Sequence, residues 1–179
     1  MHYGKLKMGV VDDSKYRKER IKILWILREP NGENFDFKNF LKDPRVYSRW
    51  KSSYGLVVKT SNALLNNHTN PFLYPKDIPE IMSRIALINV KKTGGKAKID
   101  DKKIREYLLQ NPDELQNQIK ELSPDIIILA GTGGYISEER IKEKAGKNTI
   151  IVKAFHPNQK KIKHGDYISN ILKAVDKAS

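Results

Sequence analysis

The sequence predicts an α/β protein with a four-stranded, mainly parallel sheet in a three-layer α/β/α arrangement. Four short apolar runs rich in β-branched residues are typical of buried strands, and they cover residues 21–27, 85–90, 125–131 and 148–155. Helix-like segments separate these runs, and strands that alternate with helices form parallel sheets covered on both faces. No internal repeat or linker is visible, so we expect one domain over residues 21–179 after a basic surface extension at residues 1–20.

Capping residues and chain breakers place the helices between these strands. Asp100 and Ser137 are suited to cap helices, while Asn111-Pro112 and Gly146 are suited to end them. A helix is also expected within residues 47–66, where apolar residues recur at mixed spacing, and a short helix within residues 74–84. The remaining predicted helices cover residues 101–110, 113–122, 137–146 and 166–175.

The composition narrows the class of protein. The 179 residues include no cysteine, which excludes disulfides, thiolate zinc sites and cysteine-bound iron–sulfur clusters. No apolar run is long enough to cross a membrane, so we expect a cytoplasmic protein. The 34 lysines and arginines exceed the 21 acidic residues, for a formal charge of +13, which favours a nucleic-acid partner. The alternative is a generally lysine-rich chain whose charges are scattered over solvated faces.

Polar residues follow each predicted strand. In a parallel sheet the carboxyl ends of the strands form one crevice, where ligands bind. His156 ends the fourth apolar run because Pro157, which lacks an N–H, cannot continue a strand. The residues at the four strand ends are Arg28, Glu29, Pro30 and Asn31; Asn89, Lys91 and Lys92; Gly131, Thr132 and Gly133; and His156, Pro157 and Asn158.

Three of these strand ends carry motifs that resemble the uracil-DNA glycosylase superfamily. They are "LREPN" from Leu27, "INVKKTGG" from Ile88, and "HPN" from His156. The resemblance spans residues 21–175 and implies a uracil-DNA glycosylase-like fold. Leu27 replaces the usual glycine and Asn158 the more frequent serine, which indicates a divergent branch. The absence of cysteine excludes the iron–sulfur branch.

The resemblance implies a base-excision enzyme of DNA repair that flips a base out of the stack. His156 would stabilise negative charge on the leaving base, and Glu29 would orient the attacking water. Glu29 could instead form a strand-end ion pair. Asn89 would read the base edge with its amide donor and acceptor, although it could simply cap a turn. Either Phe35 or Phe37 would stack on the base, unless both belong to the core.

Several residues near the strand ends are suited to contact DNA. Ile162 would act as a wedge that fills the gap left by the flipped base, or it would pack against the last helix. Trp25 and Trp50 are expected in the core. The candidate phosphate contacts are the side chains of Lys91, Lys92, Lys160, Lys161 and Lys163 and the backbone of the turn Gly131, Thr132 and Gly133.

We therefore expect a monomeric DNA glycosylase without metal or cofactor that acts on uracil or a related damaged base. Two alternatives stay open. The first is a nucleic-acid-binding protein of the same fold without catalysis, and the second is a small nucleoside or nucleotide hydrolase that uses the same crevice.

Overall fold

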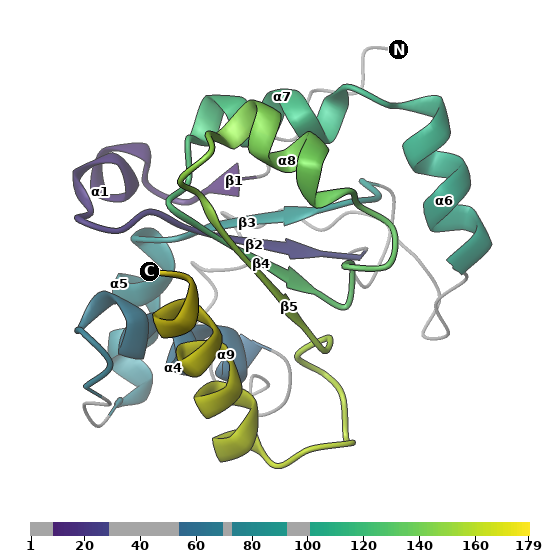
Figure 1. Ribbon diagram of the computed structural model, residues 1–179. Helices are drawn as coiled ribbons and strands as arrows, with labels where there is room; N and C mark the ends of the chain where they lie inside the picture. The colour runs from purple at the N-terminus through teal and green to yellow at the C-terminus, as the bar shows by residue number, and fades with distance from the viewer. Residues whose placement is uncertain (1–8, 29–53, 70–72, 93–100) are drawn as a thin grey trace.

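The structure is a computed structural model that describes residues 9–28, 54–69, 73–92 and 101–179. It confirms the α/β class and has helices packed around a five-stranded mixed sheet (Figure 1). The strands are β1 (Gly9–Val10), β2 (Ile23–Leu27), β3 (Ala86–Asn89), β4 (Ile126–Ala130) and β5 (Ile150–Ala154). The helices are α1 (Asp13–Lys18), α4 (Tyr54–Leu65), η1 (Pro75–Asp77), α5 (Ile78–Ser83), α6 (Asp101–Gln110), α7 (Glu114–Leu122), α8 (Glu138–Ala145) and α9 (His164–Ala178).

The predicted number of four strands is wrong, because the segment before β2 adds a fifth. The strand order is β1-β3-β2-β4-β5, and only β1 runs antiparallel to its neighbour. Gly9 and Val10 pair with Leu87 and Ala86 along the outer edge of β3. A strand of two residues carries no readable apolar pattern, so the sequence alone gives no sign of it.

Two clusters of buried side chains, one on each face of the sheet, produce three layers. Ile23, Trp25 and Leu27 of β2 belong to the cluster formed with α4, α5 and α9. Leu24 and Ile26 belong to the opposite cluster, formed with α1, α6, α7 and α8. This alternation follows from the two-residue period of a strand. Trp25 is fully buried and donates its indole N–H to Ser61 Oγ at 2.9 Å, which confirms its expected place in the core.

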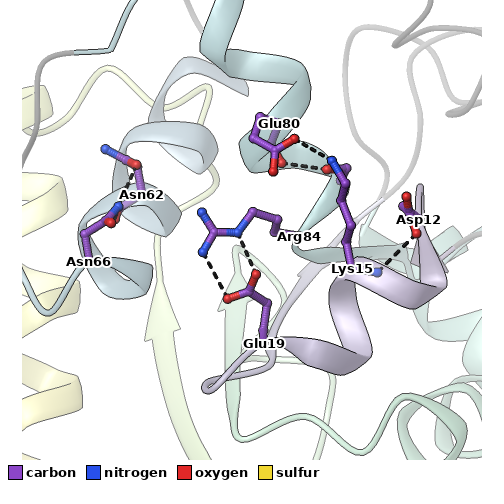
Figure 2. A network of polar contacts seen from close by, with 8 residues as sticks. Asp12, Lys15, Glu19, Asn62, Asn66, Glu80 and Arg84 are labelled. Carbon is purple, nitrogen blue, oxygen red and sulfur yellow. Dashed lines mark hydrogen bonds and ion pairs between the residues drawn. The ribbon is translucent and has the colours of Figure 1, made fainter.

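The segment after β1 is tied to the rest of the molecule by packing and charge. The sequence placed it in an extension over the surface, but Tyr16 of α1 is fully buried in the core. Glu19 accepts two hydrogen bonds from the Arg84 guanidinium, at 2.6 and 3.1 Å, and Lys15 pairs with Glu80 of α5 at 2.5 Å (Figure 2). Residues 9–19 are therefore an integral part of the fold.

The predicted helices are present wherever the structure describes their residues. Ser137 caps α8 by accepting a hydrogen bond from the Arg140 amide, and Gly146 ends that helix at a φ of 116°. Asp100 and residues 47–53 lie outside the described residues. Within the described ranges, no helix has the length and apolar character needed to span a membrane.

Candidate functional site

The strand order places a topological switch point between β2 and β4. The chain leaves β2 for β3 on one side and leaves β4 for β5 on the other side. Ligands of open α/β sheets bind outside the carboxyl ends of the strands at such a point. Arg28 and Gly131 are the first residues beyond β2 and β4, and Arg28 donates its Nε–H to the Gly131 carbonyl oxygen at 2.7 Å. The two strand ends at the switch point are therefore directly connected.

Gly131 brings the end of β5 close to this connection. It has a φ of 73°, which disfavours other residues, and a Cβ added there would lie 2.9 Å from His156 Cβ and 3.2 Å from Arg28 Nε. Its amide donates to the Ala154 carbonyl at 2.7 Å, so it has no free N–H for a phosphate. Gly131 thus allows Arg28 and His156 to approach each other across β4.

His156 is held as a neutral imidazole with a defined tautomer. Its Nδ1 accepts a hydrogen bond from the Asn158 backbone N–H at 3.2 Å, so the proton of the neutral ring resides on Nε2. Burial, together with the positive charge of Arg28, lowers the pKa of His156 to about 4. Among the described residues, Nε2 has no hydrogen-bond partner. The ring therefore presents an N–H donor at neutral pH.

Asn89 is the last residue of β3, at the carboxyl edge of the sheet. The residue is 8% exposed. Its amide atoms are not among the described side-chain atoms that are both fully buried and without a hydrogen-bond partner, so no unsatisfied group demands a ligand here. A primary amide at this edge has the donor and acceptor needed to pair with a base, and the role of Asn89 in reading a base edge stays a prediction.

Lys92 supports the strand end that carries Asn89. Its ammonium donates to the Asn89 carbonyl oxygen at 2.7 Å and to Gln118 Oε1 at 2.8 Å. Burial lowers the pKa of Lys92 to about 8, and Glu114 partly offsets this effect. The Lys92 ammonium, a predicted phosphate contact, is engaged within the protein by these two bonds. Its contact with DNA stays a prediction.

A cluster of charged and aromatic side chains borders the switch point, and sequence reasoning missed it. The Cζ atoms of Arg28 and Arg105 lie 5.7 and 5.1 Å from the ring centroid of Tyr135. Tyr135 donates its hydroxyl to Asp101, whose carboxylate also lies 3.6 Å from Arg28 Nη1. Arg28, which belongs to the "LREPN" motif, was the only sequence signal, because α6 and the turn after β4 come together only in the fold.

The predicted phosphate contacts differ in their surroundings. Lys160, Lys161 and Lys163 are exposed on the segment between β5 and α9, whereas Lys91 is partly buried. Thr132 is fully buried and donates its hydroxyl to the Ile26 carbonyl at 3.0 Å, so its side chain supports the sheet. Gly133 lies in the turn after β4.

The predicted wedge, Ile162, is partly buried against the core cluster that includes α9. Its amide and carbonyl are both bonded to the Gln159 side chain, at 2.9 and 3.1 Å. This contact matches the alternative expectation for Ile162, while the wedge role stays a prediction.

Three predicted site residues, Glu29, Phe35 and Phe37, lie outside the described residues, as does Trp50. Among the residues that are described, no group of three or more His, Asp or Glu side chains is arranged to hold a metal ion. No protein-family model matches the chain, and no curated protein is significantly similar to it. The site must therefore be interpreted from its own geometry.

Proposed function

We propose that the protein is a DNA base-excision glycosylase that hydrolyses the N-glycosidic bond of uracil or a related damaged base. The uracil-DNA glycosylase-like fold suggested by the sequence motifs belongs to this proposal. One observation carries it: a neutral His156 with its proton on Nε2 stands at the carboxyl edge of a parallel sheet. An N–H donor at this place is suited to stabilise the negative charge that develops on a leaving base.

The surroundings of His156 support the same reaction. Asn89 offers a side-chain amide at the end of β3, which can match the N3–H and O4 groups of uracil. Lys160, Lys161 and Lys163 provide exposed positive charge on the segment that follows His156, where a DNA backbone would pass. Recognition, charge stabilisation and backbone binding can therefore meet at one edge of the sheet.

The decisive experiment measures release of free base from a single-stranded oligonucleotide that contains one uracil. The matched thymine oligonucleotide is the control substrate. We expect uracil release by the natural protein, and a loss of about 10²- to 10³-fold in His156→Ala with an unchanged thermal unfolding midpoint. Release that is equally fast in both proteins would contradict the assignment of His156.

The same assay separates the alternatives. Tight binding of the oligonucleotide without any base release would favour a nucleic-acid-binding protein that lacks catalysis. Cleavage of free deoxyuridine as fast as the oligonucleotide would favour a small nucleoside hydrolase, because such an enzyme gains nothing from a DNA backbone.

A further inference from the structure

A cavity of about 530 Å³ lies next to the candidate site, on the side of the edge strand β5. The turn after β4 contributes Gly133 and Gly134, and the end of β5 contributes Phe155. Ile162 lines it from the segment between β5 and α9, and Tyr167 and Asn170 line it from α9 itself. Neither His156 nor Asn89 is among the described lining residues, so this space is separate from the groups that we assign to chemistry.

Phe155 makes the mouth of this cavity unusual. It directly precedes His156 and is 49% exposed, which makes it one of the three exposed large apolar side chains among the described residues. Its backbone is fixed, because the Tyr167 hydroxyl donates to the Phe155 carbonyl oxygen at 2.8 Å. The ring is therefore held at the surface from a rigid strand end.

The charges around the mouth favour an anionic ligand with a flat ring. The Lys161 ammonium lies 5.7 Å from the centroid of the Phe155 ring. Lys153, which also lines the cavity, is neutralised by Glu138 at 2.6 Å, whereas no acidic partner among the described residues pairs with Lys161. An aromatic face with an adjacent free cation is the combination that binds a nucleobase together with its phosphate.

The interior of the cavity is suited to the same ligand. Gly134 leaves open backbone along one wall, the Lys153 side chain packs over Gly133, and Ile162 and Tyr167 provide apolar surface. The exposed side chain of Asn170 offers an amide donor and acceptor on the part of the cavity formed by α9. A volume of about 530 Å³ lies within the range of small-molecule sites and can accept one nucleoside.

We propose that this cavity is a second base-binding site, which takes a nucleobase of the strand flanking the target nucleotide. The flanking base stacks on Phe155, and its phosphate lies at the Lys161 ammonium. This inference rests on the proposed function, since it assumes that a DNA strand passes the His156 edge. It adds a preference for single-stranded substrate, because a paired base cannot enter the cavity.

The test uses single-stranded oligonucleotides with one uracil and one 2-aminopurine, placed in turn at each position within three nucleotides of the uracil. Stacking on an aromatic side chain quenches 2-aminopurine fluorescence, so the quenched position identifies the base that enters the cavity. We expect quenching at one flanking position with the natural protein and its loss in Phe155→Ala. Phe155→Trp should retain it, because an indole ring also stacks.

Affinity provides the second measurement. Stacking of one base on an aromatic residue corresponds to a loss of about 5- to 100-fold in affinity when the residue is replaced by alanine. We expect a loss in this range for Phe155→Ala. Tyr74→Ala is the matched control, because Tyr74 is 55% exposed with Lys76 Nζ 5.5 Å from its ring centroid, yet it lies just before η1 and does not line the cavity. Its affinity should stay within twofold of the natural protein.

The outcomes separate the two proposals. If the natural protein releases uracil but Phe155→Ala changes neither quenching nor affinity, the base-binding site is refuted and the glycosylase assignment stands. If quenching and its loss are observed without base release, the site stands and the enzyme does not. If the natural protein binds no oligonucleotide, both proposals fail.

Discussion

The backbone N–H of Asn158 lies 3.2 Å from His156 Nδ1 and donates a hydrogen bond to it, so the turn after β5 sets the tautomer of its own histidine. The donor belongs to the main chain. A serine at this position, as in the motif that the sequence resembles, could make the same bond. The presence of Asn158 in place of the more frequent serine therefore leaves the orientation of the imidazole unchanged.

The low pKa of His156 predicts a pH-dependent stability. In the unfolded chain its pKa is near 6.5, and in the folded protein it is about 4. Between these values the unfolded state binds more protons, so the stabilisation is fully present above pH 6.5 and is lost as the pH falls toward 4. Urea unfolding at several pH values should show this decline, and His156→Gln should flatten it. An NMR titration that places the folded pKa near 6.5 would contradict the mechanism.

Asn89 provides a test of base recognition. Uracil presents a donor at N3 and an acceptor at O4, and cytosine presents the reverse pattern. An unmatched polar group costs about 1–3 kcal/mol, so Asn89→Ala and Asn89→Asp should each reduce uracil release about 5- to 150-fold. Asn89→Asp can keep weak activity or shift it toward cytosine when its carboxyl is protonated. If both variants release uracil at the natural rate, Asn89 does not read the base.

Lys92 and the lysines after His156 should affect different steps. Replacing Lys161 and Lys163 by alanine should weaken binding to all DNA sequences and lower the salt dependence of affinity by about 0.9 log unit for each lost duplex contact. Lys92→Met should instead slow uracil release and leave that salt dependence unchanged, because the Lys92 ammonium bonds to the Asn89 carbonyl. A reduced salt slope in Lys92→Met would place its ammonium at a phosphate.

Thr132 should prove to be a structural residue. Its hydroxyl is buried and donates to the Ile26 carbonyl across the switch point. Thr132→Val keeps the shape but removes this hydrogen bond, so we expect a loss of about 0.5–1.5 kcal/mol in the free energy of unfolding. DNA affinity should be unchanged, and Thr132→Ser should restore most of the stability. Weaker DNA binding in a fully stable Thr132→Val would instead indicate direct contact.

The paired hydrogen bonds between Glu19 and Arg84 should make residues before β2 necessary for stability. Their side chains are only 15% and 25% exposed, so Arg84→Ala is expected to lower the free energy of unfolding by about 1–3 kcal/mol. Lys15→Ala is the matched control on the same face. It removes a pair whose side chains are 44% and 55% exposed and should cost less than about 1 kcal/mol. Equal effects would show that burial does not decide the strength of these pairs.

Local sequence patterns were sufficient for most elements of the fold. The four apolar runs correspond to β2, β3, β4 and β5. Ser137 and Gly146 mark the start and the end of α8, as their capping chemistry predicts. β1 could not be predicted, because two residues carry no period and its existence depends on the open edge of β3. The order of the parallel strands within the sheet could not be predicted either, because no local pattern encodes it.

The candidate site was predictable only as a set of strand ends. Asn89 and His156 follow apolar runs, so the sheet rule placed them at one edge. The bond from Arg28 to Gly131 and the contacts of Tyr135 with Arg105 and Asp101 join segments distant in the chain. Burial also altered the interpretation of Lys92 and Thr132, since residue type alone does not reveal whether a polar group is already satisfied.

The central position of β2 has a consequence for how the chain folds. Its neighbours β3 and β4 come much later in the sequence, and the amide of Lys22, just before β2, bonds to Asp125, 103 residues further on. During synthesis β2 therefore waits for β3, and its other edge stays unpaired until β4 has left the ribosome. Such non-local pairing slows folding and exposes unpaired strands to aggregation. A nascent chain arrested before β4 should depend on chaperones, whereas one that includes β5 should not.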